Sequence, residues 1–434
     1  MRPSHRTSIA LAAVALALTA GLGRAAPAGP AWSRVSGPTQ PGVQLGIART
    51  PDGVLHVIWN RGASPTSIFE TRLSASGKTL GTSTVATGFD GNGGLGLLAM
   101  PDHTLRLFAA GATHPGSPTY GITNFTAPAS GRSWTLQSAY WGGAVANSSG
   151  VIGATLTKDG QPVTAWRGFA AEGLAPTAPQ SAYQAGMTES QLATDASTGA
   201  VVLSGVTNAG AGGVYVQQVI PSPAARVVLP LPAGENDWYT SLSGRIGAGG
   251  VYVAYTDTKS VRLYSYGGGS KTLARGSFTS AGVCPGPDGR LWIAWAARGD
   301  GLFVTRSNRA ASAFEPVQRL TLAQAADGLT FLQCEGSAGP LDLFANVPGG
   351  GAAGFWHTHV LPQFSMGAQS TKTAVTLSVR DAGDPMADVS ITVAGKHLKT
   401  DARGRVTLTL RPGSYTATAT AAGYASGSAR ITVR

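Results

Sequence analysis

Short hydrophobic runs separated by turn residues follow one another along most of the chain. The clearest is the apolar run Leu291 to Trp295, which follows the turn Pro287-Asp288-Gly289 and precedes a loop and a second apolar run ending at Arg306. Branched and aromatic residues between Gly, Pro and Asp are typical of β-strands joined by tight turns. The pattern therefore predicts a pair of antiparallel strands.

Weaker copies of this unit recur through residues 32–362. The turn position marks each copy, and the seven markers are Gly53, His103, Gly160, Gly199, Gly250, Gly289 and Gly339. Their spacing is close to the length of a propeller blade, about 40–50 residues. A hairpin cannot bury both of its faces alone, whereas sheets stacked around an axis can. We therefore predict an all-β chain with a seven-bladed β-propeller, or a six-bladed one if a weak copy is an insertion.

The two ends of the repeated region have a different pattern. We expect Trp32 to Gly37 (WSRVSG) to pair with the last blade and close the ring. Residues 363–373 (QFSMGAQSTKT) are polar and predict a linker. Residues 374–434 alternate hydrophobic and polar positions in runs such as VTLSVRD and GRVTLTL, which predicts a small antiparallel β-sandwich with one face buried.

The first 28 residues have the features of a signal peptide. A basic start with Arg2 and Arg6 precedes the apolar run Ile9 to Leu22, and small residues follow it. This run is too short for a membrane-spanning helix, which needs about 20 residues. A retained anchor is the alternative. We expect a secreted or cell-surface protein without a stable membrane span.

Charge changes this picture only slightly. The formal net charge is +11, but the basic residues are scattered singly and form no Lys/Arg-rich run. Nucleic acid is therefore not an expected partner. A basic surface can still attract anionic wall polymers. The expected partners are an extracellular glycan, a cell-wall polymer or a protein.

The chain has two cysteines, Cys284 and Cys334, each five residues before a marker glycine. They therefore occupy equivalent positions in adjacent blades. Because an exported chain permits disulfides, we predict a Cys284–Cys334 bond, with two free buried thiols as the alternative. The cysteine spacing favours neither a metal site nor a cofactor.

Two family resemblances refine the fold. The last sixty residues, with Gly383-Asp-Pro385, Thr400-Asp-Ala-Arg-Gly404 and Pro412-Gly-Ser-Tyr415, resemble the carboxypeptidase regulatory-like (prealbumin-type) β-sandwich modules. That resemblance implies an accessory, noncatalytic module. The repeated region is similar to sialidase-type secreted β-propellers. Their Asp-box turns have partial counterparts at Ser74 to Leu80 and Ala129 to Thr135, both without the Asp.

Candidate chemistry is sparse. A working sialidase would need an arginine triad, a Tyr–Glu pair and an acidic proton donor, and we assign none of them. The densest polar and aromatic cluster is Glu235-Asn-Asp-Trp-Tyr239, where carboxylates beside aromatic rings suit a sugar. We therefore predict ligand contacts at Glu235, Asp237, Trp238 and Tyr239, with an ordinary exposed loop as the alternative.

A second polar motif lies near the end of the repeated region. His357 and His359 share one strand face, which two metal ligands would require, but we identify no acidic partner for them and predict no metal site. The sequence favours a noncatalytic binding or scaffolding protein of the bacterial cell envelope. A sialidase-like glycoside hydrolase and a purely structural surface protein are the alternatives.

Overall fold

The computed structural model describes residues 31–39, 44–61, 66–89, 94–111, 121–138, 148–168, 172–175, 187–207, 213–230, 241–257, 259–299, 301–321, 332–347, 351–371 and 374–433. Within these ranges the regular structure is β-strand, apart from a three-residue 3-10 turn, η1 (Pro287–Gly289). The predicted signal peptide lies outside the described residues. The described part holds no helix long and apolar enough to cross a membrane.

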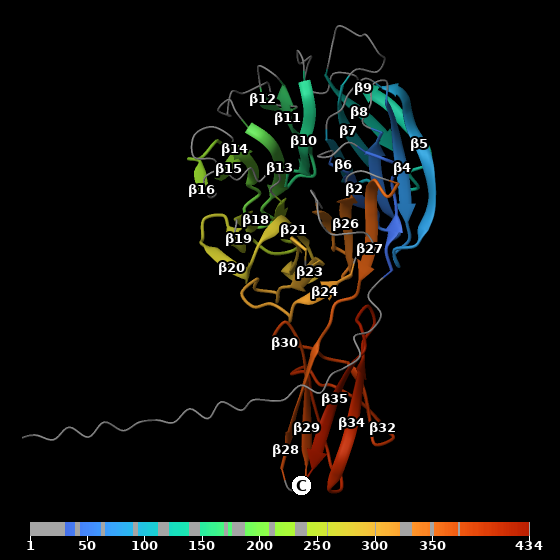
Figure 1. Cartoon of the computed structure of the whole chain (residues 1–434), viewed down its shortest axis with the longest axis vertical. Coiled ribbons are helices and arrows are strands. Elements are labelled where there is room, and N and C mark those ends of the chain that lie inside the picture. Colours follow the sequence, from blue (N-terminus) through green and yellow to red (C-terminus); the bar gives the residue numbers. More distant parts are fainter. Residues whose placement is uncertain are drawn as a thin grey trace, which may run out of the picture.

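Seven antiparallel sheets follow one another along the described residues from 46 to 360, and each pairs strands that are neighbours in the chain, except that the seventh also takes in the N-terminal strand β1 (Figure 1). The first three sheets comprise β2 (Gly46–Arg49), β3 (Leu55–Asn60), β4 (Thr66–Leu73) and β5 (Thr79–Phe89); β6 (Leu95–Ala99), β7 (Leu105–Gly111), β8 (Gly121–Ala127) and β9 (Thr135–Ser138); and β10 (Ser148–Leu156), β11 (Pro162–Gly168) and β12 (Glu172–Ala175). The fourth and fifth comprise β13 (Met187–Thr194), β14 (Val201–Thr207), β15 (Gly213–Ile220) and β16 (Val227–Pro230); and β17 (Ser241–Gly244), β18 (Val251–Asp257), β19 (Ser260–Ser265) and β20 (Ser270–Arg275). The last two comprise β21 (Phe278–Pro285), β22 (Leu291–Ala297), β23 (Gly301–Arg306) and β24 (Gln318–Leu320); and β25 (Leu332–Glu335), β26 (Leu341–Val347), β27 (Gly354–Val360) and β1 (Ser33–Arg34).

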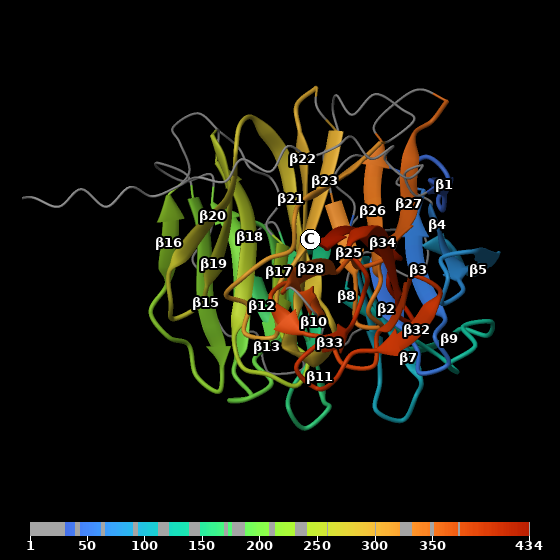
Figure 2. The same cartoon turned by 90° about the horizontal axis from the view of Figure 1, so that it is seen from below.

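These sheets form a closed ring. The first strand of each sheet contacts the first strand of the next, and β25 of the seventh sheet contacts β2 of the first. Figure 1 shows the first strands around the centre and the last strands, such as β5, β16 and β20, at the rim. Figure 2 shows the same sheets from the side, with their strands running alongside one another. Hydrophobic clusters fill the spaces between successive sheets.

The N-terminal strand completes the seventh sheet. In β1, Ser33 pairs with His357 and Arg34 pairs with Trp356 of β27. The backbone of Val35 extends this pairing by donating to the carbonyl of Phe355 at 2.9 Å. The prediction that residues 32–37 pair with the last repeated unit is confirmed.

The backbone also supports the repeat that the sequence defined. All seven marker positions have positive φ, including the single non-glycine marker, His103, at φ 66°. Glycine reaches this region without a steric penalty, which explains why it holds the other six positions. A positive φ at the marker, between the first and second strands, is thus common to all seven copies.

The C-terminal unit (residues 365–433) consists of two four-stranded sheets around one core. One sheet contains β28 (Ser365–Ser370), β29 (Val375–Asp381), β30 (Asp384–Pro385) and β33 (Arg405–Leu408); the other contains β31 (Ser390–Val393), β32 (Lys396–Lys399), β34 (Gly413–Thr420) and β35 (Gly427–Val433). Alternate residues such as Val375, Leu377 and Val379 point into the shared core. The unit extends from the rim of the ring near β23 and β24 (Figures 1 and 2).

The predicted linker needs a correction. Residues 365–370 form the strand β28, which pairs with β29 from Ser365–Arg380 to Ser370–Val375. Five of the six β28 residues are exposed, because this edge strand turns little surface toward the core. Without a buried face, the strand has no hydrophobic alternation from which the sequence could predict it.

Candidate functional site

The ligand contacts predicted from the sequence lie outside the described residues. Glu235, Asp237, Trp238 and Tyr239 all fall in residues 231–240, between β16 and β17. This segment joins the last strand of one sheet to the first strand of the next. The equivalent connection one sheet later, from β20 to β21, is described, and it borders a pocket.

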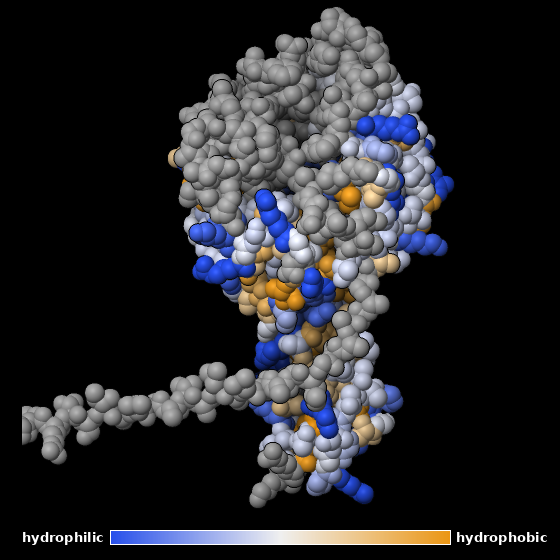
Figure 3. Space-filling model, in the orientation of Figure 1, coloured by the Kyte–Doolittle hydropathy of each residue, from blue (hydrophilic) through white to orange (hydrophobic). Residues whose placement is uncertain are grey.

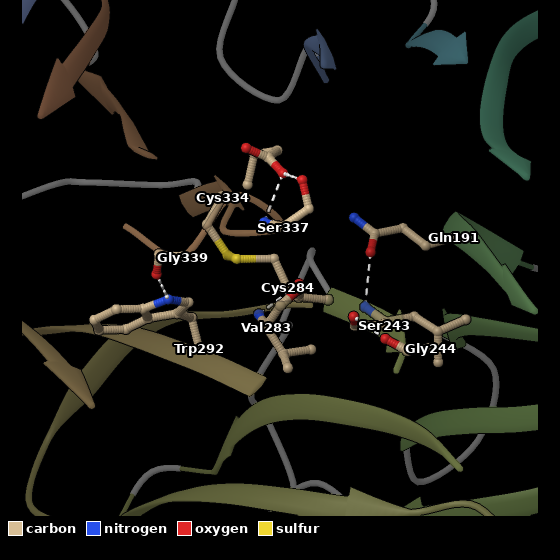
Figure 4. The surroundings of a disulfide bond; sticks show 12 residues. Gln191, Ser243, Gly244, Val283, Cys284, Trp292, Cys334, Ser337 and Gly339 are labelled. Carbon is tan, nitrogen blue, oxygen red and sulfur yellow. Dashed lines mark hydrogen bonds between the residues drawn. A yellow bond between two sulfur atoms is a disulfide. The ribbon is translucent and has the colours of Figure 1, made fainter. Parts of the chain in front are cut away.

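The centre of the ring holds a polar cavity of about 190 Å³, lined by the first strands of all seven sheets. Its polar side chains bind backbone groups of the neighbouring sheet. Gln333 accepts from the amide of Leu45 at 2.7 Å and donates to its carbonyl at 3.2 Å. In the same way, Gln191 accepts from the amide of Leu242 at 2.7 Å (Figure 4). These side chains are engaged in holding the ring together.

A disulfide joins two of the first strands at the same level. Cys284 of β21 and Cys334 of β25 are bonded, with their Cα atoms 5.7 Å apart. Figure 4 shows Trp292 beside this bond, with its indole nitrogen donating to the carbonyl of Gly339 at 2.9 Å. The covalent link therefore connects the sixth and seventh sheets, whereas hydrogen bonds of Gln333 and Gln191 connect the seventh sheet with the first and the fourth with the fifth.

A larger pocket, of about 430 Å³, opens between the fifth and sixth sheets. Its described lining comprises Ala274, Arg275, Gly276, Ser277, Phe278, Trp295, Ala297, Arg298, Phe303 and Val317. Figure 3 shows hydrophobic surface beside hydrophilic residues over the part of the ring that Figure 1 labels β20 to β24. Pockets of this size are suited to small-molecule ligands.

Strand register builds the aromatic floor of this pocket. Trp295 of β22 lies opposite Phe303 of β23 in the ladder, so both side chains are on the same face of the sixth sheet. Their rings are stacked, with centroids 5.9 Å apart and an interplanar angle of 16°. Trp295 is buried and Phe303 is half-buried, so the ring of Phe303 is the more accessible of the two.

Two arginines from different sheets border the floor. Arg275 ends β20 of the fifth sheet, and Arg298 follows β22 of the sixth; both are exposed. The amide of Arg298 donates to the carbonyl of Ser277 at 3.0 Å, which joins the end of β22 to the loop between β20 and β21. Within the described residues neither guanidinium has a carboxylate within ion-pair distance. As far as the described part of the chain extends, both guanidinium groups face solvent without an ion pair.

The first sheet contains a repeat-related aromatic pair with a different environment. Trp59 and Phe69 are stacked with centroids 4.5 Å apart, and they lie opposite each other in β3 and β4. Here the guanidinium of Arg61 covers the ring of Phe69, 5.7 Å from its centroid. At this distance a cation–π attraction operates. The same pair of rings is thus covered in the first sheet and borders a pocket in the sixth.

The two histidines near the ring closure have an acidic partner that the sequence analysis missed. Asp342 lies 2.8 Å from His357 Nε2 and 3.0 Å from His359 Nδ1, and it also bonds Arg49 of the first sheet. Burial alone would raise the pKa of Asp342, but the hydrogen bonds from His357 and His359 lower it to about 2. Among the described residues no group of three or more His, Cys, Asp or Glu could hold a metal ion. This cluster joins the first and seventh sheets.

The Asp-box-like turn at residues 129–135 also joins neighbouring sheets. Trp134 donates to Glu70 Oε2 at 3.1 Å, and His56 Nδ1 lies 2.6 Å from the other oxygen of the same carboxylate. Glu70 and His56 belong to the first sheet and are fully buried, whereas Trp134 precedes β9 of the second. The tryptophan of this turn therefore holds adjacent sheets together.

Comparison with solved structures gives the class of fold. The chain is similar to the BP39L lectin from Burkholderia pseudomallei, with 14% identity over 73% of this chain and 96% of the lectin, and a TM-score of 0.50. A Hadza microbial sialidase, Hz136, has 9% identity over 74% of this chain and 66% of its own, with a TM-score of 0.43. A six-bladed β-propeller lectin from Aleuria aurantia has 10% identity over 71% and 90% of the two chains, with a TM-score of 0.40.

The first of these similarities supports a β-propeller fold, and the antiparallel sheets, six with four described strands and one with three, fit its blades. No family model and no curated protein sequence matches the chain.

The sequence analysis did not select the residues of this pocket, although Trp295 was part of its clearest unit. The position of Phe303 opposite Trp295 follows from the hairpin, so a register argument could have found it. Nothing in the sequence pairs Arg275 with Arg298, because they come from different sheets and meet only through the packing of the ring.

Proposed function

We propose that this protein binds carbohydrate without cleaving it, and that the pocket between the fifth and sixth sheets holds the sugar. The supporting observation is the combination in one pocket of a stacked aromatic floor and two arginines that have no carboxylate partner among the described residues. The ring of Phe303 offers an apolar face to the C–H groups of a pyranose, and the guanidinium groups offer several hydrogen-bond donors. A planar guanidinium pairs best with a carboxylate, so a sugar acid is the favoured ligand.

The wider proposal concerns architecture and location. We propose that the seven sheets are the seven blades of a propeller spanning residues 32–362. Residues 374–434, which form most of the C-terminal unit, would be an accessory module of the carboxypeptidase regulatory-like type. With residues 1–28 as a signal peptide, the protein would be secreted and would act at the cell envelope, where glycans and wall polymers are its natural ligands.

A glycan array can test the binding function with an internal control. Phe303→Ala removes the accessible ring of the floor, whereas Phe69→Ala removes its repeat-related counterpart, which Arg61 covers. Because both rings are half-buried, we expect each substitution to cost a similar stability, about 2 kcal/mol. Only Phe303→Ala should weaken glycan binding, by about tenfold or more.

Three results would contradict the proposal. Equal loss of binding in both variants would show that the effect is one of stability. The absence of any array binding by the wild-type protein would remove carbohydrate as the ligand. Release of free sugar from a bound glycan would contradict the noncatalytic part. Pairs of glycans that differ only by a carboxylate would test the preference for a sugar acid.

A further inference from the structure

A buried group of charged side chains joins the ring to the C-terminal unit. The ring contributes Arg290, which directly precedes β22, Arg306 at the end of β23, and Glu315 of the loop before β24. The C-terminal unit contributes Asp381 of β29, Asp384 of β30 and Tyr424 of the turn before β35. None of these residues belongs to the pocket proposed to bind sugar.

Arg306 is at the centre of this group. Its Nη2 atom lies 2.5 Å from Asp381 Oδ2, 3.1 Å from the Tyr424 hydroxyl and 3.5 Å from Glu315 Oε1. The Tyr424 hydroxyl donates to the same oxygen of Asp381 at 2.7 Å. The side chains of Arg306, Asp381 and Glu315 are at most 2% exposed. Solvent therefore screens these charges very little.

Arg290 provides the second positive charge. Its Nη2 atom lies 2.7 Å from Asp384 Oδ2 and 3.3 Å from Asp381 Oδ2. The amide of Arg309 also donates to Asp384, at 2.9 Å, across the interface. At the exposed edge, the side chain of Arg309 lies 3.4 Å from Asp288. These groups complete the charged surroundings of the interface.

The charges balance only if Glu315 is neutral. Two arginines match the two ionised aspartates, and an ionised Glu315 would add an uncompensated buried negative charge. Among the described residues, both Glu315 oxygens and Asp381 Oδ1 lack a hydrogen-bond partner. A proton on Glu315 would satisfy this arrangement by forming a hydrogen bond to Asp381. Such a shared proton is the usual state of two carboxyl groups in one buried site.

We propose that docking of the C-terminal unit on the ring takes up one proton at the Glu315–Asp381 pair, so that the interface is tightest in mildly acidic surroundings and weakens as the pH rises. The buried, charge-balanced geometry carries this proposal. It gives the protein a link between its domain arrangement and the acidity outside the cell, separate from ligand binding.

The direction of the effect follows from proton linkage. Burial raises the pKa of Glu315, the hydrogen bond that its protonated form would donate to Asp381 raises it further, and the attraction of Arg306 opposes both; the result is about 8, against an ordinary 4.5. Between these values the docked form holds one proton more than the undocked form. The docking equilibrium constant should therefore fall by about tenfold for each pH unit and level off above the upper value.

Asp381 acts in the opposite direction. Burial alone would raise its pKa, but the hydrogen bond that a protonated Glu315 would donate and the charge of Arg306 lower it below 3.8. Its stabilising contribution is thus complete above that value and is lost only as the pH falls further. Docking is strongest between the loss of this contribution and the ionisation of Glu315.

The test uses the full mature protein and Glu315→Gln, which keeps the size of the side chain and remains neutral. Hydrogen exchange of the Arg309 amide reports docking directly, because its acceptor Asp384 lies in the C-terminal unit. Protection is compared between wild type and variant at each value from about pH 5 to about pH 8, so that the intrinsic pH dependence of exchange cancels. Urea unfolding over the same range gives a second measurement.

We expect wild-type protection to fall relative to Glu315→Gln by up to about tenfold per pH unit. Glu335→Gln, which changes a buried carboxylate at the ring closure, should keep the wild-type pH dependence. A constant ratio between wild type and Glu315→Gln across the range would overturn the proposal, as would wild-type unfolding that does not depend on pH. Sugar binding is measured separately, so neither result depends on the proposed ligand.

Discussion

Both faces of the sixth sheet combine tryptophan with arginine, yet the two clusters lie in opposite surroundings. On the face toward the seventh sheet, Arg306 lies over Trp292, with its guanidinium carbon 5.4 Å from the ring centroid. This arginine is buried and bonded to the carboxylate of Asp381 in the C-terminal unit. On the face toward the fifth sheet, Arg298 borders the Trp295 floor and is exposed.

The two faces contain the same residue types and differ in the groups that bind their arginines. A buried guanidinium must be paired, and once it is paired it serves the fold. An exposed guanidinium beside an accessible ring keeps its donors for a ligand. Residue type therefore does not distinguish the proposed binding pocket from the structural cluster; burial and the presence of carboxylates do.

The largest effect on stability should come from removing the buried arginine, Arg306. Arg306→Met leaves Asp381 without its closest positive charge, and we expect a loss of about 3–5 kcal/mol in the free energy of unfolding. The side chain of Arg262 is 41% exposed and forms an ion pair with Asp257. Removing this pair by Arg262→Met should lower the free energy of unfolding by less than about 1 kcal/mol. Urea denaturation of both variants checks this. Equal costs would mean that the buried cluster contributes no more than a surface pair.

An intermediate effect is expected from the covalent link on the same face. Replacing both Cys284 and Cys334 by Ser should lower stability by about 2–4 kcal/mol, since the bond restricts the unfolded chain. Sugar binding should be retained, because the pocket lies on the opposite face of the sheet. Thermal unfolding and the glycan array together test this separation. Loss of sugar binding by a variant that is still fully folded would show that the two faces of the sixth sheet are coupled.

The smallest effect on stability should come from the exposed face. Arg298→Gln changes a side chain without an ion pair in the described residues, so the free energy of unfolding should stay within about 0.5 kcal/mol. Affinity for a carboxylated sugar should fall by about tenfold, whereas affinity for its neutral counterpart should change little. Titration by intrinsic fluorescence measures both. Arg403→Gln, an exposed arginine of the C-terminal unit, is the control and should change neither affinity.

The repeat could be predicted from sequence because its cause is local. A positive φ in a tight turn selects glycine, and His103 fits the same register without being glycine. The pairing of β1 with β27 was also predictable, since an unpaired segment preceded the first unit. The strand β28 was missed because its exposed positions leave no hydrophobic period.

The pocket could not be predicted from the sequence, because its residues come from two sheets. Arg275 and Arg298 line the same pocket because the fifth and sixth sheets pack side by side. Sequence spacing does not specify where two neighbouring sheets leave room for a pocket. The acidic partner of the two histidines could have been predicted from the strand register. Asp342 lies opposite His359 in the β26–β27 ladder, so placing the hairpin register would have brought the two together. The contacts predicted at Glu235, Asp237, Trp238 and Tyr239 stay a prediction.

The pairing of β1 with β27 has a consequence for how the chain folds. Ser33 meets His357 only after almost the whole ring has been made, so ring closure joins positions far apart in the sequence and is expected to be a late, slow step. Until then, β27 presents an open row of backbone donors and acceptors, a template for pairing with another chain. The unfinished ring is therefore the species most exposed to aggregation, and the few residues of β1 protect it by occupying that edge.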